Sequence, residues 1–412
     1  MSTKNIYIRI ALPIIIMAVV EVSCSRDDDP YDDNLYLLSA EKAFTMPAIS
    51  IKNLINIMAG TQPEISGLTD LIEHDVEVYS ITYSTEVYGQ EITASGLVCF
   101  PATPGDYPVL SFQNGTNTLH SKAPSVNPSD FSYQLIEDVA SMGFIVLIPD
   151  YPGFGSSDNI AHPYLLKEPT IRSVVDMLNA LREFDDDVAL IADATDDLYL
   201  FGYSQGGWAT LALHREVEEN SPAGFNLIAS AAGAGPADLK GMLATFIAAE
   251  EYPMPSYFAY IAHSYKTYNR FATGYDDIFN EPYASAIPTL FNGLLSTSAI
   301  NAELTTDVTA LLTPGFRSGF TTGTEYAAVR QALEDNGIAA WKTTTPLLLI
   351  HGEGDTQVPA SGSVALYDGM IAAGSSASMV TIQLIPEVDH GDGLIPAAVG
   401  SLLFLFQFAA GR

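Results

Sequence analysis

The sequence predicts an α/β protein: a doubly wound, mostly parallel sheet with an antiparallel N-terminal edge and a helical cap insertion. Three observations lead to this class: apolar runs of strand length, helical patterns between them, and one alternating stretch near the start. Apolar runs that Gly, Pro or Asp bound are typical of parallel strands covered on both faces. Such runs stand at 108–112, 143–151, 198–203, 226–232, 346–352 and 380–386.

The alternating stretch covers residues 75–100, "DVEVYSITYSTEVYGQEITASGLVCF", and turns around Gly89. Alternation of apolar and polar residues predicts an antiparallel pair of strands. Helical patterns follow further on, and in 169–184 the apolar residues fall on one face of a helix. Strands that alternate with helices favour a doubly wound sheet.

Residues 236–341 interrupt this alternation. They contain no convincing strand and are rich in aromatic residues, as in "EYPMPSYFAYIAHSYKTYNRF" at 251–271. We interpret them as a helical insertion between two strands of the sheet. Its aromatic residues could form a small core of their own, or line a substrate pocket, or do both.

The composition excludes several classes of protein. With 48% hydrophobic and 16% charged residues, the chain is expected to be globular. There are 17 Lys and Arg against 49 Asp and Glu, a net charge of −32. This surface repels phosphate backbones, so we expect no nucleic acid partner. Two cysteines, Cys24 and Cys99, exclude a disulfide-rich scaffold, and Cys99 is predicted to be a buried free thiol.

The N-terminus indicates export. Lys4 and Arg9 precede an apolar run at 10–20, which is too short to span a bilayer and is typical of a signal peptide. The run ends in "VEVSC", which resembles a bacterial lipobox and would make Cys24 the lipidated first residue, although Glu21 departs from that pattern. The acidic "SRDDDP" that follows resembles the signal that sends lipoproteins to the outer cell surface of Gram-negative bacteria. An ordinary cleaved signal peptide, with a periplasmic or secreted product, is the alternative.

The segment "LYLFGYSQGGWATLAL" at 198–213 carries the first chemical motif. Its "GYSQG" fits the G-x-S-x-G nucleophile elbow, in which a serine, here Ser204, stands on a sharp turn between a strand and a helix. Side chains at Gly202 and Gly206 would collide with their neighbours in such a turn. The pattern alone is weak, but an apolar strand precedes it and a helical run follows it, as the motif requires.

A serine hydroxyl needs a base, and the base needs an orienting carboxylate. Asp355 follows the apolar run at 346–352, and His390 follows the run at 380–386. Serine, acid and histidine thus come after three separate strands, in the order that the motif requires. His351 and Asp389 are less suitable, because His351 precedes the acid and Asp389 is adjacent to the base.

An oxyanion needs two backbone N–H donors. The residue after the nucleophile, Gln205, should supply one of them. The loop "QNGTN" after the run at 108–112 should supply the other, with Thr116 as the first candidate and Asn114 as the second. The histidines show no paired spacing that would hold a metal, so we expect neither a metal nor a cofactor.

Taken together, "PDYPGFGSS" at 149–157, the "GYSQGG" elbow and "HGEGDTQVP" at 351–359 resemble the α/β-hydrolase superfamily, and within it the secretory lipase and serine esterase group. The resemblance covers about 75–235 and 341–412, and implies an α/β-hydrolase fold. One departure is "QNGT", where many relatives have His-Gly. The expected division of the chain is a lipoprotein signal peptide at 1–24, an acidic tether at 25–45, a first core segment at 46–235, a cap at 236–341 and a second core segment at 342–412.

These motifs predict a serine hydrolase that cleaves carboxylic esters through Ser204, Asp355 and His390. A peptidase or amidase on the same residues is one alternative, and a surface binding protein without turnover is another. The expected partner is a small-molecule, lipid or glycan ester, with membrane contact only through the lipid anchor. The sequence leaves the oligomeric state and the substrate specificity open.

Overall fold

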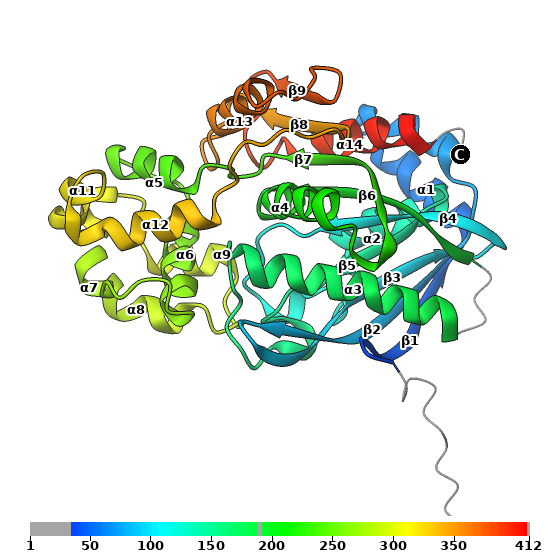
Figure 1. The fold of residues 1–412 in the computed structure, drawn as a ribbon, viewed down its shortest axis with the longest axis horizontal. Coiled ribbons are helices and arrows are strands. Elements are labelled where there is room, and N and C mark those ends of the chain that lie inside the picture. The colour runs from blue at the N-terminus through cyan, green and yellow to red at the C-terminus, as the bar shows by residue number, and fades with distance from the viewer. Residues whose placement is uncertain (1–33, 188–191, 410–412) are drawn as a thin grey trace, which may run out of the picture.

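A computed structural model describes residues 34–187 and 192–409. They form a nine-stranded sheet, ordered β1-β2-β3-β5-β4-β6-β7-β8-β9, with helices on both faces and a helical body at one end (Figure 1). β1, β2, β3 and β5 pair antiparallel, and from β5 to β9 all neighbours are parallel. The strands are β1 Leu37–Met46, β2 Val76–Val87, β3 Gln90–Pro101, β4 Gly105–Gln113, β5 Ile145–Pro149, β6 Ala192–Tyr203, β7 Asn226–Gly233, β8 Leu347–Gly352 and β9 Val380–Ile385. The predicted fold class is confirmed.

Helices of the core cover the two faces of the sheet. α3 and α4 share one hydrophobic core with the helical body, while α1, α2 and α14 pack on the opposite face. None of the helices in the described part of the chain is both long and apolar enough to cross a membrane. The core helices are α1 Ala48–Met58, α2 Phe131–Glu137, α3 Lys167–Asp187, α4 Gln205–Asn220, α13 Ser361–Ala372 and α14 Leu394–Ala409, with short 3₁₀ helices at Pro63–Leu71 (η1), His120–Lys122 (η2), Asp138–Met142 (η3), Gly155–Ser157 (η4) and Pro222–Gly224 (η5).

The edge of the sheet starts earlier than the sequence indicated. The expected division assigned residues 37–45 to the tether, but they form most of β1, which pairs with β2 and becomes the antiparallel edge. Two register shifts along β1, together with the exposure of most of its side chains, remove the alternation that announces a strand. Glu183 of α3 holds the start of β1 by accepting backbone N–H groups from 35–37. The expected signal peptide, Cys24 and the first part of the tether lie outside the described residues.

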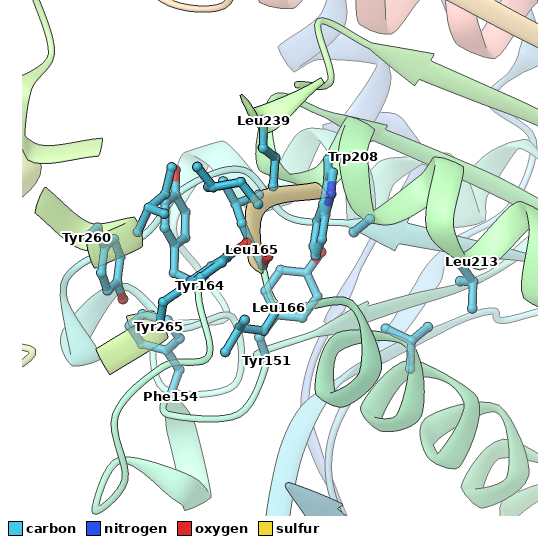
Figure 2. Close-up of a cluster of buried hydrophobic side chains, with 14 of the residues drawn as sticks. Tyr151, Phe154, Tyr164, Leu165, Leu166, Trp208, Leu213, Leu239, Tyr260 and Tyr265 are labelled. Carbon is cyan, nitrogen blue, oxygen red and sulfur yellow. Dashed lines mark hydrogen bonds between the residues drawn. The ribbon is translucent and has the colours of Figure 1, made fainter. Parts of the chain in front are cut away.

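The chain between β7 and β8 is helical, as the sequence indicated, while the proposed domain boundaries at 236 and 341 stay predictions. Its aromatic side chains gather in the interior and against the core (Figure 2). Tyr260 of α6 stacks on Tyr164, which belongs to the loop between β5 and α3, with ring centroids 4.3 Å apart. The helices are α5 Leu239–Ala248, α6 Pro255–Thr267, α7 Tyr275–Ile278, α8 Tyr283–Leu290, α9 Thr297–Glu303, α10 Val308–Leu311, α11 Pro314–Gly319, η6 Thr324–Tyr326 and α12 Ala327–Asn336.

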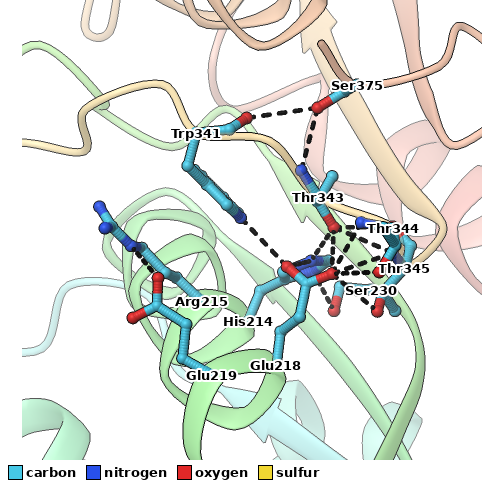
Figure 3. Close-up of polar contacts among 10 residues, drawn as sticks. All are labelled: His214, Arg215, Glu218, Glu219, Ser230, Trp341, Thr343, Thr344, Thr345 and Ser375. Carbon is cyan, nitrogen blue, oxygen red and sulfur yellow. Dashed lines mark hydrogen bonds and ion pairs between the residues drawn. The ribbon is translucent and has the colours of Figure 1, made fainter. Parts of the chain in front are cut away.

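The chain that returns from the insertion is fastened to α4 by the carboxylate of Glu218 (Figure 3). One oxygen of Glu218 accepts the backbone N–H groups of Thr344, at 2.7 Å, and Thr345, at 3.1 Å. The hydroxyl of Thr343 and the indole N–H of Trp341 donate to the same carboxylate. Burial acts to raise the pKa of Glu218, but hydrogen bonds from His214, Thr344 and Thr343 outweigh it and hold the pKa well below its usual range. A charged carboxylate therefore joins α4 to the segment that leads into β8.

Candidate active site

The elbow predicted around Ser204 is a sharp turn between β6 and α4. Ser204 has φ 60° and ψ −121°. Residues other than glycine rarely adopt this backbone conformation, so it stores strain. The neighbouring glycine is a steric requirement, because a Cβ at Gly206 would lie 1.8 Å from the carbonyl oxygen of Gln113. The turn brings Ser204 to the carboxyl ends of the parallel strands, where sites of open α/β sheets lie.

Three predicted residues meet at this edge of the sheet. The Nε2 atom of His390 lies 2.9 Å from the Oγ atom of Ser204, and its Nδ1 atom lies 2.6 Å from Oδ2 of Asp355. All three residues are less than a tenth exposed. The chain of hydrogen bonds from serine through imidazole to carboxylate is thus continuous and largely shielded from water.

The charge of Asp355 sets the proton positions in this chain. Burial acts to raise the pKa of Asp355, but hydrogen bonds from His351 and His390 and from the backbone N–H of Val358 outweigh it and hold the pKa well below its usual range. An ionised carboxylate only accepts hydrogen bonds, so the proton of the neutral His390 ring stands on Nδ1. Its Nε2 atom is then free to accept the hydroxyl proton of Ser204.

Asp355 has a second histidine partner, His351, at the end of β8. The Nε2 atom of His351 lies 2.9 Å from the carbonyl oxygen of Val358 and 3.2 Å from Oδ2 of Asp355. A carbonyl oxygen only accepts, so Nε2 of His351 carries the proton, and Nδ1 accepts the hydroxyl of Ser363 at 2.8 Å. His351 therefore donates to the same Oδ2 atom of Asp355 that accepts from His390. Its bond to the carbonyl of Val358 holds the loop that follows β8.

The predicted oxyanion residues come from two segments, the start of α4 and the loop after β4. Gln205 begins α4, and Thr116 follows β4; within the described residues the backbone N–H of neither donates to a protein acceptor. The hydroxyl of Thr116 lies 2.9 Å from that of Tyr164. Asn114, the second candidate, is held by its side-chain N–H, which donates to the carbonyl of Pro149. Gln205 is adjacent to Ser204 in the chain, and Thr116 lines the same cleft as Ser204, in a loop held by the side-chain bonds of Thr116 and Asn114.

The side chain of Gln205 is held by a buried histidine that the sequence did not indicate. The Nδ1 atom of His162 lies 2.7 Å from the carbonyl of Pro152, so it carries the proton, and Nε2 accepts the side-chain amide of Gln205 at 2.9 Å. Burial lowers the pKa of His162 to about 4, although the bond to Pro152 acts in the other direction. His162 is therefore neutral at pH 7 and fixes the side chain next to Ser204.

A cleft of about 480 Å³ opens beside Ser204 and His390, and we call it the Ser204 cleft. Its size is in the range of cavities that hold small-molecule ligands. Within the described residues, no group of three or more His, Cys, Asp or Glu side chains is placed to hold a metal ion. The walls of the Ser204 cleft come from β4, β6, the loop after β4, α2 and α14. The residues that line it include Phe112, Thr116, Leu135, Ile136, Phe201, Tyr203, Leu394, Ile395 and Ala398.

Comparison with known families identifies the family to which the chain belongs. A model described as "Alpha/beta hydrolase family" matches residues 120–398, which include Ser204, Asp355 and His390. The chain belongs to this family. No curated protein matches the sequence of this hydrolase.

Solved structures resemble this hydrolase over nearly its whole length. A Legionella pneumophila protein assigned as a hydrolase is 27% identical, with a TM-score of 0.82, and the match covers 92% of this chain and 99% of that chain. The rice cell wall degrading esterase LipA of Xanthomonas oryzae is 23% identical, with a TM-score of 0.76 and coverage of 90% and 96%. Lipase A of Candida antarctica is 16% identical, with a TM-score of 0.64 and coverage of 92% and 86%. The last two support the fold alone.

Sequence reasoning missed several residues that shape the site of this hydrolase. Tyr203 donates its hydroxyl to the carbonyl of His390 at 2.7 Å, and so links the elbow to the loop that carries the base. Tyr164 reaches Thr116, and His162 reaches Gln205, from the loop between β5 and α3. That loop carries part of "PDYPGFGSS", whose resemblance to the family was the available signal. Trp208 of α4 is fully buried.

Proposed function

We propose that this hydrolase cleaves carboxylic esters through an acyl-enzyme on Ser204. The observation that carries the proposal is the continuous hydrogen-bonded chain from Ser204 through His390 to Asp355. This arrangement of serine, imidazole and carboxylate activates a serine hydroxyl on unrelated folds. An esterase and a lipase share this fold, and their printed activities make esters the first substrates to test.

In the first half of the reaction, the Oγ atom of Ser204 attacks the ester carbonyl carbon and gives its proton to Nε2 of His390. Asp355 holds the Nδ1 proton and stabilises the imidazolium that forms. The backbone N–H groups of Gln205 and Thr116 hold the negative oxygen of the tetrahedral intermediate. His390 then returns the proton to the alcohol oxygen as the carbon–oxygen bond breaks.

In the second half, a water molecule takes the place of the alcohol next to His390. His390 removes a proton from this water, whose oxygen attacks the acyl carbon, and Ser204 leaves with the proton that His390 returns. The carboxylic acid departs, and the starting state is restored. The backbone N–H groups of Gln357 and Val358, which donate to Asp355, keep the carboxylate in place through both halves.

The test is the hydrolysis of p-nitrophenyl esters by the full chain and by Ser204→Ala. We expect the variant to lose activity by a factor on the order of 10⁶, because the three residues act as a unit. A fluorophosphonate should label the native protein and not the variant, since only an activated serine reacts. A folded variant that keeps the native rate would refute the proposal. A native protein that cleaves anilides and no esters would support the amidase alternative.

We also propose that the protein is exported and lipid-anchored through Cys24 to the outer membrane of a Gram-negative bacterium, exposed at the cell surface. The lipobox-like "VEVSC" and the acidic residues after it support this, and both lie outside the described residues. Mass spectrometry of the N-terminal peptide from expressing cells tests the anchor. We expect the native protein to begin with a diacylated Cys24 and the Cys24→Ser protein to carry no such lipid. A native N-terminal peptide without lipid would refute the anchor.

A further inference from the structure

The walls of the Ser204 cleft come from the core of the hydrolase and hardly from the insertion. Of the described residues that line it, one, Tyr257 on α6, belongs to the insertion. The apolar walls are formed by Leu135 and Ile136 of α2 and by the start of α14, with Phe112 and Phe201 from the ends of β4 and β6. Ser204 and the loop that carries Thr116 open onto this cleft, so the reacting carbonyl and these apolar walls share one space.

Most polar side chains of the cleft already have partners within the protein. Lys122 and Ser132 both donate to the carboxylate of Asp130. Tyr133 donates its hydroxyl to the carbonyl of Lys122 at 2.8 Å, and Asn117 bonds to the backbone of Leu119 in both directions. Because these groups are satisfied, the surface left for a ligand is mainly aliphatic and aromatic. An apolar ligand gains free energy from covering such a surface.

We propose that the Ser204 cleft is the acyl-binding site and takes an aliphatic chain, with α14 setting the longest chain that fits. This inference rests on the proposed ester hydrolysis at Ser204. The acyl chain runs from the carbonyl carbon at Ser204 between α2 and α14. The insertion then contributes support for the site rather than the wall that recognises the chain.

The start of α14 is the part of the wall that a substitution can change most cleanly. Leu394 and Ala398 are four residues apart, so they lie on one face of the helix, and both line the cleft. Ala398 is partly exposed, and a larger side chain there would enter the cleft rather than a closed core. Leu403 is 46% exposed on the same helix and does not line the cleft. Ala398, which lines the cleft, and Leu403, which does not, are therefore a test position and its control on the same helix.

The test compares kcat/KM for p-nitrophenyl acetate, octanoate and palmitate in the full chain, in Ala398→Phe and in the control Leu403→Phe. We expect Ala398→Phe to lower the ratio of octanoate to acetate at least tenfold, and Leu403→Phe to keep the native ratio. Leu394→Ala should widen the cleft and raise the ratio of palmitate to octanoate. Thermal unfolding and fluorophosphonate labelling show whether each variant is folded and has an active serine.

The outcomes separate this inference from the proposed function. If Ala398→Phe labels normally and keeps the native chain-length profile, the acyl site is elsewhere, while ester hydrolysis stands. A second series, acetate esters of alcohols of increasing length, tests the other side of the ester. A change in that series alone would assign the cleft to the alcohol and overturn the acyl assignment. If the native protein hydrolyses no ester through Ser204, the proposed function itself fails.

Discussion

The aromatic insertion and the Ser204 cleft are both rich in apolar side chains, and they use them in opposite ways. In the insertion, large aromatic rings are covered by one another: Phe291 stacks on Tyr260, and Tyr260 on Tyr164, with centroids 4.4 and 4.3 Å apart. In the cleft, aliphatic side chains such as Leu394 stay partly exposed beside the serine. An aromatic-rich segment is therefore a poor guide to a binding site, because its rings can be fully occupied by packing.

The largest expected effect tests whether the insertion, which contributes only Tyr257 to the described lining of the cleft, acts mainly as a support for the site. Tyr260→Ala removes the middle ring of the stack and leaves a cavity, so the free energy of unfolding should fall by about 3 kcal/mol. Chemical denaturation measures this fall, and Tyr260→Phe, which keeps the ring, is the control. The chain-length profile of the remaining activity should stay native. A profile shifted toward longer chains would show that the insertion does line the acyl site.

The wall of the cleft should respond to pH. Glu137 and Asp138, at the end of α2 and the start of η3, are buried, and none of their carboxylate oxygens has a partner within the described residues. Burial, and for Glu137 also the charge of Asp138, raises the pKa of Glu137 to about 8 and that of Asp138 to about 7. The buried thiol of Cys99, the free cysteine that the sequence predicted, feels both carboxyls, and burial raises its pKa as well.

Because the folded pKa of each carboxyl is above its unfolded value near 4, its contribution to stability is complete below pH 4 and is lost as the pH rises to about 8. We expect Tm to fall by several degrees between pH 5.5 and pH 8.5. In the double variant Glu137→Gln and Asp138→Asn, this fall should largely disappear. Scanning calorimetry over this range measures both proteins, and equal pH dependence would contradict the prediction.

The smallest expected effect concerns the hydroxyl of Tyr164. It connects the stack of Tyr164 and Tyr260 to the loop that carries Thr116. Tyr164→Phe keeps the ring but removes the bond to Thr116, which is worth about 1 kcal/mol. We expect kcat to fall about fivefold with KM nearly unchanged, because the loop would hold the transition state less well. The control is Tyr265→Phe, which loses a bond to the carbonyl of Leu165 away from the loop. Equal kcat values in the two variants would contradict a positioning role for Tyr164.

The sequence predicted those parts of the molecule that depend on local patterns of residues. Apolar runs gave the parallel strands, and the glycines around Ser204 gave the elbow. The meeting of Ser204, Asp355 and His390 followed from one topological rule, that the ends of parallel strands share an edge. The catalytic roles of these residues stay a prediction until Ser204→Ala is assayed.

Other features could not be predicted because they depend on contacts between distant residues. β1 escaped notice since its two register shifts erase the alternation of an edge strand. The bond between His351 and Asp355 spans only four residues, yet it depends on how the loop after β8 folds back. The Ser204 cleft was missed because the apolar face of α14 reads the same in sequence whether another element covers it or leaves it open.

The carboxylate of Glu218 has a consequence for how this hydrolase could be altered by evolution or by protein engineering. It clamps the returning chain at 343–345 onto the same helix that starts at the elbow. At the other end of α4, the outgoing chain packs against the backbone of the helix: a Cβ on Gly235 would lie 2.7 Å from the carbonyl carbon of Gly207. Both ends of the insertion are thus anchored independently of what lies between them. We expect the length and sequence of this segment to tolerate exchange without a change at Ser204 only where the stack of Tyr260 on Tyr164 and the cleft residue Tyr257 are kept.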